Sequence, residues 1–377
     1  MTYDETVTYL FNCAPPFQQV GGAAYKEGLS TTIALDNHLG NPHRRYRTIH
    51  VAGTNGKGST SHTLAAILQE SGYKVGLYTS PHLVDFRERI KVNGKQASKE
   101  YVIEFVEKHK AFFEPLSPSF FELTTAMAFN YFAEQQVDIA VIEVGLGGRL
   151  DCTNIITPAL GIITNISGAH QENFATLQQK CAEKLLLLKE CDIIIYNADN
   201  RELTDCIEHS ASPSREIAWS RTDAERPLYI ESVITEENGT TVKYRYLTME
   251  GSYRIPFVDN ASIEDSINCL AAALYLMVPP ETIAERMALL EPIAMRLEVK
   301  EGKRTENGFS AYVQPTLCPQ TDLEAHIPMN FNLITFEGAA AGRQSLYGQG
   351  AGRYPTAYNV VQDLCDLLQG SGFYAPC

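Results

Sequence analysis

The stretch Arg47-Thr-Ile-His-Val-Ala-Gly-Thr-Asn-Gly-Lys-Gly-Ser-Thr60 decides the fold of this chain. It opens with a β-branched apolar run, Ile49 to Val51, which is typical of a buried strand. Glycines at positions 53, 56 and 58 interrupt the run, and apolar residues return at helical spacing between Leu64 and Leu68. The stretch therefore predicts a strand, a glycine loop and a helix.

Glycine loops of this kind bind phosphate groups, because glycine lets the backbone approach an anion and the free amides of a helix start point at it. Lys57 adds a charge that can reach the outer phosphates. The loop is a P-loop variant, since Val51 replaces the first glycine and Gly58 separates Lys57 from Ser59. The alternative is an ordinary glycine turn between a strand and a helix. The predicted nucleotide-binding residues are Gly53, Thr54, Asn55, Gly56, Lys57, Gly58, Ser59 and Thr60.

Composition indicates an acidic globular protein. The chain has 377 residues, 44% of them hydrophobic, and this length predicts two or three domains. A net charge of -14 argues against nucleic acid or a membrane surface as a partner, because phosphate-rich surfaces would repel it. The 9 cysteines have no paired C-x-x-C spacing, which is typical of reduced cytosolic thiols. We find no signal peptide and no membrane-spanning apolar run, so we expect a cytoplasmic protein.

Strands and helices alternate through the first half of the chain. This alternation predicts a doubly wound, mostly parallel α/β sheet with helices on both faces. Between residues 214 and 258 the pattern changes to short strands, which predict a small antiparallel sheet. We assign residues 1–300 to the first domain and 305–377 to a C-terminal segment. Further strands are predicted at Lys74–Tyr78, Val137–Glu143, Ala159–Thr164, Cys191–Tyr196, Tyr229–Ile234 and Thr241–Leu247.

Polar residues lie where two of these strands end, at the edge where α/β sheets bind ligands. Glu143 is a lone acid in an apolar run, and its burial would be costly without a cation or a basic side chain beside it. In a phosphate site that cation is Mg²⁺, which binds carboxylates together with phosphate oxygens. A structural salt bridge is the alternative. His82 follows the neighbouring strand and is either a site residue or a surface histidine.

The glycine loop and the run Val141-Ile-Glu-Val-Gly-Leu-Gly-Gly-Arg-Leu-Asp-Cys-Thr-Asn-Ile-Ile156 resemble folylpolyglutamate synthase/dihydrofolate synthase, a branch of the Mur ligase superfamily. The resemblance covers about residues 1–166. It implies an enzyme that uses Mg²⁺ and ATP to phosphorylate a substrate carboxylate, after which the amino group of glutamate attacks the acyl phosphate. The implied small-molecule substrates are folate or dihydropteroate and glutamate.

The same resemblance assigns roles to residues. Lys57 and the glycine loop would hold the phosphates, while Ser80 and Glu143 would bind magnesium. The residues in stretches that resemble the pteridine site are Phe120, Phe121, Arg149 and Asp151.

Residues 164–302 look more like the ligase that adds D-alanyl-D-alanine to the muramoyl tripeptide, a related branch. By this likeness His170 is a metal ligand, Asn268 an adenine contact and Arg296 a phosphate contact. Lys184 falls where the superfamily has a carbamylated lysine, with a solvated helix lysine as the alternative. The implied catalytic residues are Lys57, His170 and Lys184.

The final segment departs from the superfamily. Neither Asp-Gly-Ala-His-Asn nor Asp-x-Tyr-Asn occurs after Arg296, and residues 307–368 instead resemble the C-terminal part of homoserine dehydrogenase. That enzyme's nucleotide-binding domain is not found in this sequence. We therefore interpret glycines 348, 350 and 352 as a turn that caps a helix, Ala357–Leu368, rather than as a nicotinamide site. Strands of a small α+β fragment are predicted at Phe309–Val313 and Phe331–Phe336.

We therefore expect an acid–amino-acid ligase of the folylpolyglutamate synthase type, weakened by its unusual C-terminal segment. A replaced third domain would leave apolar surface uncovered, so self-association is expected. The alternatives are a muramoyl-peptide ligase and a non-catalytic protein that binds Mg²⁺ and ATP.

Overall fold

A computed structural model of the chain describes residues 1–12, 28–82, 84–145, 149–166, 191–209 and 215–291. It also describes short pieces at 181, 185–186, 304–305, 308–309, 331–338 and 342–349. The chain divides into two compact units, Met1–Glu291 and Pro292–Cys377, and each is described by itself below.

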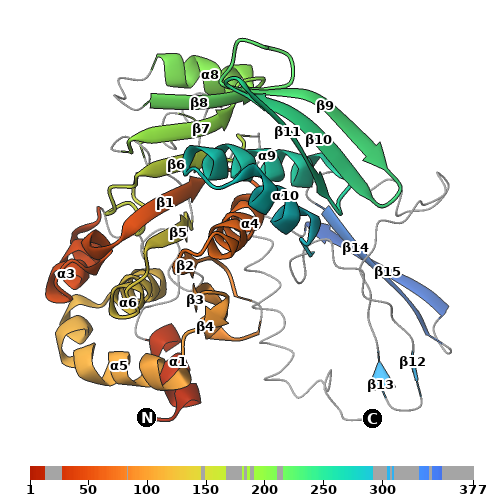
Figure 1. The fold of residues 1–377 in the computed structure, drawn as a ribbon. Helices are drawn as coiled ribbons and strands as arrows, with labels where there is room; N and C mark the ends of the chain where they lie inside the picture. The colour runs from red at the N-terminus through yellow and green to blue at the C-terminus, as the bar shows by residue number, and fades with distance from the viewer. Residues whose placement is uncertain are drawn as a thin grey trace. The chain divides into compact units, whose positions relative to one another are not determined.

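The first unit is built on one 11-stranded sheet. Its strands are β1 (Arg47–Ala52), β2 (Val75–Tyr78), β3 (Ile90–Val92), β4 (Lys95–Gln96), β5 (Ile139–Glu143), β6 (Leu160–Ile163), β7 (Ile193–Asn197), β8 (Arg215–Ser220), β9 (Leu228–Glu236), β10 (Gly239–Tyr246) and β11 (Met249–Ile255). They lie in the order β11-β10-β9-β8-β7-β6-β1-β5-β2-β3-β4 (Figure 1). Pairing is parallel from β9 to β2 along this order and antiparallel at both ends. The predicted α/β fold with a mostly parallel sheet is confirmed.

Helices cover both faces of the sheet. They are α1 (Tyr3–Asn12), α3 (Ser30–His38), α4 (Lys57–Glu70), α5 (Lys99–Phe113), α6 (Phe120–Glu134), α8 (Arg201–Glu208), α9 (Asn260–Tyr275) and α10 (Pro280–Ala288), with 3-10 turns η2 (Pro42–Arg45), η3 (Phe86–Arg89) and η4 (Glu114–Leu116). Helices α4, α9 and α10 pack on one face (Figure 1). On the other face α6 packs near β2 with α3 and α5 outside it, and α8 packs near β6 and β7.

Alternation along the strands explains why the sheet has a core on each face. In β5, Ile139 and Val141 join the cluster with α4 and α9, whereas Ala140 and Ile142 join the cluster with α6. A strand buried on both faces is mostly apolar, which is the pattern of Ile139–Ile142 in β5, whereas β1 is buried from Thr48 to Ala52 although Thr48 and His50 are polar.

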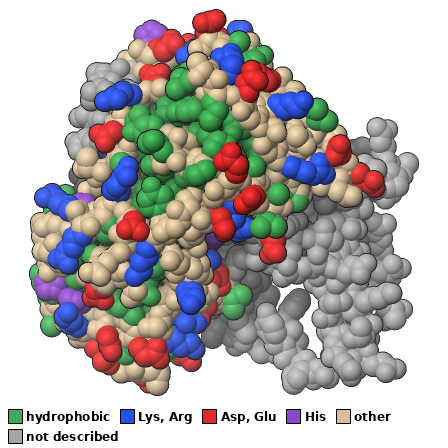
Figure 2. Space-filling view, viewed as in Figure 1, with side chains coloured by type: hydrophobic (Ala, Val, Ile, Leu, Met, Phe, Trp, Pro, Cys, Tyr) green, Lys and Arg blue, Asp and Glu red, His purple; other side chains and the backbone are tan. Residues whose placement is uncertain are grey.

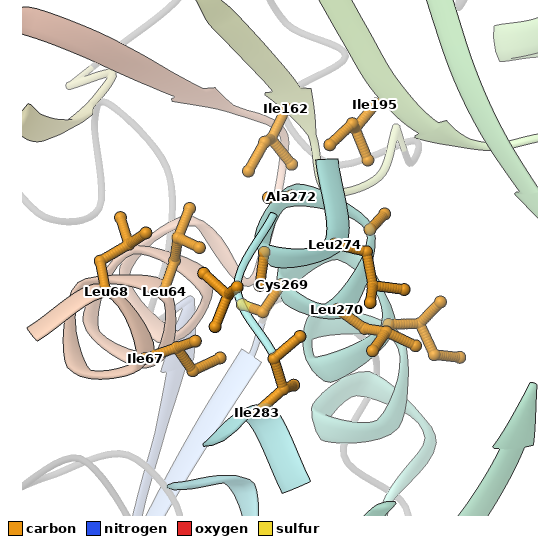
Figure 3. Packing of buried hydrophobic residues seen from close by; sticks show 14 of the residues in the cluster. Leu64, Ile67, Leu68, Ile162, Ile195, Cys269, Leu270, Ala272, Leu274 and Ile283 are labelled. Atoms are coloured by element: carbon orange, nitrogen blue, oxygen red, sulfur yellow. The ribbon is translucent and has the colours of Figure 1, made fainter. Parts of the chain in front are cut away.

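Two helices from distant parts of the sequence, α4 and α9, pack against each other on the sheet. Figure 3 shows Leu64 of α4 beside Cys269 of α9, with Ile162 of β6 above them. All three side chains are fully buried. Truncation of such a residue, for example Leu64→Ala, typically costs about 2–5 kcal/mol of stability. This contact fixes the start of α4, and with it the glycine loop, against the rest of the sheet.

The predicted small antiparallel sheet is not separate. Strand β8 pairs parallel with β7, and β9 pairs parallel with β8, so β9, β10 and β11 extend the main sheet. Only β9, β10 and β11 of this region pair antiparallel. The predicted antiparallel strands are confirmed, and the parallel pairing of Trp219 with Leu228, across the Arg221–Pro227 turn, joins them to the main sheet.

In the second unit, the described residues form two antiparallel pairs, β12 (Arg304–Thr305) with β13 (Gly308–Phe309) and β14 (Phe331–Gly338) with β15 (Gly342–Gln349). Strand β14 confirms the strand predicted at Phe331–Phe336. The glycine turn predicted to begin at Gly348 is wrong at that residue, because Gly348 lies within β15 opposite Asn332. Gly350, Gly352 and the predicted helix Ala357–Leu368 lie outside the described residues.

Charge is mixed over the described surface. In Figure 2 the basic and acidic side chains are interspersed on the face shown, and hydrophobic side chains gather on its upper part. Whether this apolar area supports the predicted self-association stays open to measurement. No helix in the described part of the chain is long and apolar enough to cross a membrane.

Candidate active site at the carboxyl edge of the sheet

The glycine loop connects β1 directly to α4, and two of its glycines are required by geometry. Gly53 has φ 150° and Gly56 has φ 78°, which side chains rarely adopt. A Cβ at Gly53 would also collide with Oγ1 of Thr164, and one at Gly56 with Oδ1 of Asp265. The loop backbone is therefore packed closely against Thr164 and Asp265, and the start of α4 lies at the carboxyl edge of the sheet.

The end of the neighbouring strand, β6, holds the loop in shape. The amide of Thr54 donates to the Asn165 carbonyl at 2.9 Å, and the amide of Asn55 donates to Asn165 Oδ1 at 3.1 Å. The Thr164 hydroxyl donates to the Asn55 carbonyl at 2.5 Å. No local sequence pattern predicts this positioning role of Thr164 and Asn165, because it depends on strand order.

The start of α4 has the features of an anion site. Gly56 is its N-cap and makes no side-chain cap, so the first amides of the helix have no capping oxygen from that residue. The Lys57 ammonium lies over the loop and donates to the carbonyls of Gly53 at 3.1 Å and Thr54 at 3.2 Å. Helix amides and a lysine together fit a phosphate group. Gly53, Gly58 and Thr60 of the predicted set are buried, and the Thr60 side chain is 0% exposed.

Glu143 and Ser80 meet at the ends of β5 and β2. Glu143 lies opposite Val51 of β1 and is 3% exposed. The Ser80 amide donates to Glu143 Oε2 at 2.9 Å, which brings the two predicted magnesium ligands into contact. A carboxylate and a hydroxyl are oxygen donors of the kind that Mg²⁺ prefers. Within the described residues no three His, Cys, Asp or Glu gather around this point, and the third predicted ligand, His170, lies outside those residues.

Asp151 is held by a chain of buried hydrogen bonds. Its Oδ1 accepts from the Thr153 amide at 2.9 Å and from the Thr153 hydroxyl at 2.5 Å. Because that hydroxyl donates to a carboxylate, its oxygen accepts from Nε2 of His50, at 2.8 Å. Asp151 is 4% exposed and His50, in β1, is 0% exposed. Arg149 is exposed, and its carbonyl accepts from the Asn154 side chain at 2.9 Å.

Phe120 and Phe121 occupy the first turn of α6. A capping box between Ser119 and Glu122 starts the helix there. The Phe120 ring stacks on Phe11, with 4.5 Å between centroids. Phe121 lies against Gly145, where a Cβ would collide with its ring, and 6.0 Å from the Tyr78 ring.

His82 follows Ser80 by two residues and is half-buried. Its Nδ1 accepts from Nε of Arg89 at 2.6 Å. Burial, and then the nearby Arg89 charge, lowers the pKa of His82 below its ordinary value. The histidine thus belongs to the same sheet edge as Ser80 and is not a loose surface residue.

The remaining predicted residues divide into two groups. Asn268 is 0% exposed in α9, and its Oδ1 accepts from the Trp219 indole at 2.8 Å. Among the described residues its Nδ2 has no hydrogen-bond partner. A contact between Asn268 and adenine therefore stays a prediction. His170, Lys184 and Arg296 lie outside the described residues.

The sequence of this chain matches the models of two protein families. The model of the Mur ligase middle domain matches residues 51–275, which include the glycine loop, Glu143 and Asn268. A model of homoserine dehydrogenase matches residues 255–365.

Among individual proteins, the dihydrofolate synthase/folylpolyglutamate synthase of Bacillus subtilis is 41% identical over 194 residues, 49% of this chain and 45% of that protein. The folylpolyglutamate synthase of Thermotoga maritima has a TM-score of 0.66 at 32% identity and covers 79% of this chain and 68% of its own. A solved FPGS–AMPPCP–folate complex has a TM-score of 0.67 at 28% identity, with 79% and 74% covered. The chain spans less than half the length of the Bacillus subtilis protein.

Proposed function

The chain belongs to the family described by the Mur ligase middle domain, and on that premise we propose that it is an ATP-dependent ligase of the folylpolyglutamate/dihydrofolate synthase type. It would join the carboxylate of folate or dihydropteroate to the amino group of glutamate. Support comes from the folylpolyglutamate synthases that resemble it, one of them solved with AMPPCP and folate. We further expect it to act in the cytoplasm with small molecules as its only substrates.

One observation carries this proposal: a phosphate loop, a buried carboxylate and a hydroxyl lie on three adjacent strands. The glycine loop follows β1, Glu143 ends β5 and Ser80 follows β2, and these strands are neighbours in the sheet. Strands lie about 4.8 Å apart, so the loop and Glu143 are one strand from each other. At this spacing Glu143 and Ser80 would hold Mg²⁺ beside the phosphates that the glycine loop would bind.

The protein's part in the first step is to bind and orient. The amides at the start of α4 and Lys57 would hold the phosphates of ATP, with Lys57 exchanging its bonds to loop carbonyls for phosphate oxygens. Glu143 and Ser80, and by resemblance His170, would hold Mg²⁺, which neutralises charge on the transferred phosphate when bound. A carboxylate oxygen of the acid substrate then attacks the γ-phosphorus, and the bond to ADP breaks.

In the second step the amino nitrogen of glutamate attacks the acyl carbon. The bond to phosphate breaks, the amine loses a proton and an amide remains. By resemblance Lys184 would be the carbamylated lysine, Arg296 would contact a phosphate and Asn268 would contact adenine. Phe121, Arg149 and Asp151 would line the heterocycle, and Phe120 would stand at its edge because its ring already stacks on Phe11. Binding two substrates side by side lowers the barrier by about 7–11 kcal/mol at ideal geometry.

The direct test supplies the purified full chain with Mg²⁺, ATP and glutamate, together with folate or with dihydropteroate. We expect release of ADP that requires both the acid and glutamate, and a product one glutamate heavier by mass spectrometry. Lys57→Ala should abolish turnover, while Lys95→Ala, an exposed lysine of β4, should not. Turnover with a muramoyl tripeptide and D-alanyl-D-alanine instead would favour the related ligase. ATP binding without turnover on either pair would favour a non-catalytic protein.

A further inference from the structure

Arg89 is a buried cation that the proposed reaction does not yet use. It ends η3, immediately before β3, and is 8% exposed. No described Asp or Glu forms an ion pair with it, whereas its neighbour Arg87 pairs with Asp85 at 2.9 Å. Buried charges are normally paired, because removing an ion from water is costly. The carboxylates of Glu143 and Glu88 attract this guanidinium from beyond ion-pair distance, so Arg89 is a buried cation with no carboxylate in direct contact among the described residues.

The contacts that Arg89 does make satisfy only part of its side chain. Nε donates to His82 Nδ1 at 2.6 Å, and the guanidinium carbon lies 5.2 Å from the centroid of the Phe120 ring. The two terminal nitrogens make no hydrogen bond to the described residues. Burial lowers the pKa of Arg89, but an arginine keeps its charge at every physiological pH. The two terminal nitrogens of Arg89 can thus donate hydrogen bonds to a ligand.

The surroundings of Arg89 indicate which partner fits. Phe86 and Phe120 meet edge to face at 5.8 Å, and the His82 ring lies 6.2 Å from Phe86. These rings form apolar, aromatic walls around a group of hydrogen-bond donors. The matching ligand is planar and conjugated and carries an oxygen that only accepts hydrogen bonds. A carboxylate fits such a fork bidentately, and the carbonyl of a heterocycle fits it singly.

The position on the sheet connects this group with the reaction edge. The Thr79 amide donates to the Arg89 carbonyl at 3.1 Å, so Arg89 is fixed to the residue before Ser80. Along the edge the order is glycine loop on β1, Glu143 on β5, Ser80 on β2 and Arg89 at β3. Arg89 therefore lies at the same edge as Glu143 and Ser80, on the side of Ser80 away from the glycine loop.

We propose that Arg89 binds an acceptor oxygen of the acid substrate, a conjugated carboxylate or heterocyclic carbonyl, with the partly exposed Phe120 ring as the wall of that subsite and the buried Phe86 ring supporting it. The proposal rests on the proposed function for the identity of the acid. It assigns to Arg89 substrate recognition and not the chemistry of phosphate transfer.

The test is equilibrium binding to the full chain by calorimetry, with folate, p-aminobenzoylglutamate and 6-hydroxymethylpterin as separate probes and AMPPCP as the reference ligand. Arg89→Gln should weaken folate binding by about 10- to 100-fold, the usual effect of losing charged hydrogen bonds, with AMPPCP affinity unchanged. Arg89→Lys should give an intermediate loss and guards against a variant that fails to fold. Arg87→Gln, in the same turn, should bind folate like the wild type.

The two fragments distinguish the source of the oxygen. Loss of p-aminobenzoylglutamate binding alone indicates a carboxylate, and loss of the pterin alone indicates the heterocycle; both support the proposal. Equal folate affinity in wild type and Arg89→Gln would overturn it, even if the enzyme turns over. Absence of ligase turnover in a wild type that binds folate through Arg89 would instead reject the proposed function. A wild type that binds none of the three probes would overturn both.

Discussion

The Ser80 amide donates a hydrogen bond to Oε2 of Glu143 at 2.9 Å, and this contact joins the ends of β2 and β5. It fixes a buried carboxylate one strand away from the glycine loop. The orientation of Glu143 is therefore set by backbone and does not depend on a ligand.

Glu143→Gln separates the charge of this residue from its structural role. The amide oxygen of glutamine still accepts from Ser80, so the thermal midpoint should change little, while the loss of charge should raise the Mg²⁺ concentration for half-maximal ADP release about 10-fold or more. Glu134→Gln, at the exposed end of α6, is the control. An unchanged Mg²⁺ requirement would remove Glu143 from the metal site.

Gly56→Ala tests how closely the loop is packed. Gly56 combines φ 78° with the nearby Asp265 carboxylate, whereas Gly72 has φ 89° with nothing within 4 Å of an added Cβ. Gly72→Ala should cost about 1–2 kcal/mol for the backbone conformation alone. Gly56→Ala should cost more and should also weaken ATP binding. Urea unfolding measures the free energy of unfolding of each variant. Equal losses in Gly56→Ala and Gly72→Ala would show that a Cβ beside Asp265 costs no stability.

Thr153→Val and Thr153→Ser test the buried chain from His50 to Asp151. Valine keeps the shape but removes the hydroxyl that donates to Asp151, while serine keeps it. We expect folate affinity to fall about 10-fold in the valine variant and ATP affinity to stay unchanged. The serine variant should resemble the wild type. Equal losses for both ligands in the valine variant would point to general damage and not to a role in orienting Asp151.

His109 gives the fold a dependence on pH. Burial, followed by the neighbouring His38, lowers the pKa of His109 from 6.5 to about 4. Between these values the unfolded chain binds more protons, so the contribution of His109 to stability is present above pH 6.5 and is lost as pH falls towards 4. In His109→Gln the plot of urea midpoint against pH should be flatter between pH 6.5 and about 4, whereas in His209→Gln it should match the wild type. Identical profiles for the wild type and His109→Gln would contradict the lowered pKa.

Local patterns in the sequence predicted much of this fold. The change from a β-branched apolar run to helical spacing across the glycine loop correctly predicted β1, the loop and α4, and the lone acid in an apolar run correctly drew attention to Glu143. Both signals lie within a few residues, where periodicity and burial cost act directly.

Contacts set by strand order could not be predicted in this way. The bonds from Thr164 and Asn165 to the glycine loop form because β6 lies beside β1. The Phe120 ring lies over the Arg89 guanidinium because α6, a distant segment of the chain, packs beside it. In the sequence Arg89 is one member of an ordinary charged run, Arg87-Glu-Arg89. Its environment becomes visible only when distant segments are placed together.

In the proposed reaction a carboxylate of the acid substrate takes the γ-phosphoryl group of ATP, and this group leaves as inorganic phosphate, with one carboxylate oxygen, when glutamate attacks the acyl carbon. Folate labelled with ¹⁸O in its side-chain carboxylate tests this directly, by the mass of the inorganic phosphate released with Mg²⁺, ATP and glutamate. The account predicts one ¹⁸O in each phosphate formed during ligation, and no labelled phosphate from Lys57→Ala. Phosphate released without label by the wild type would mean that ATP is hydrolysed by water, and would contradict ligation through an acyl phosphate.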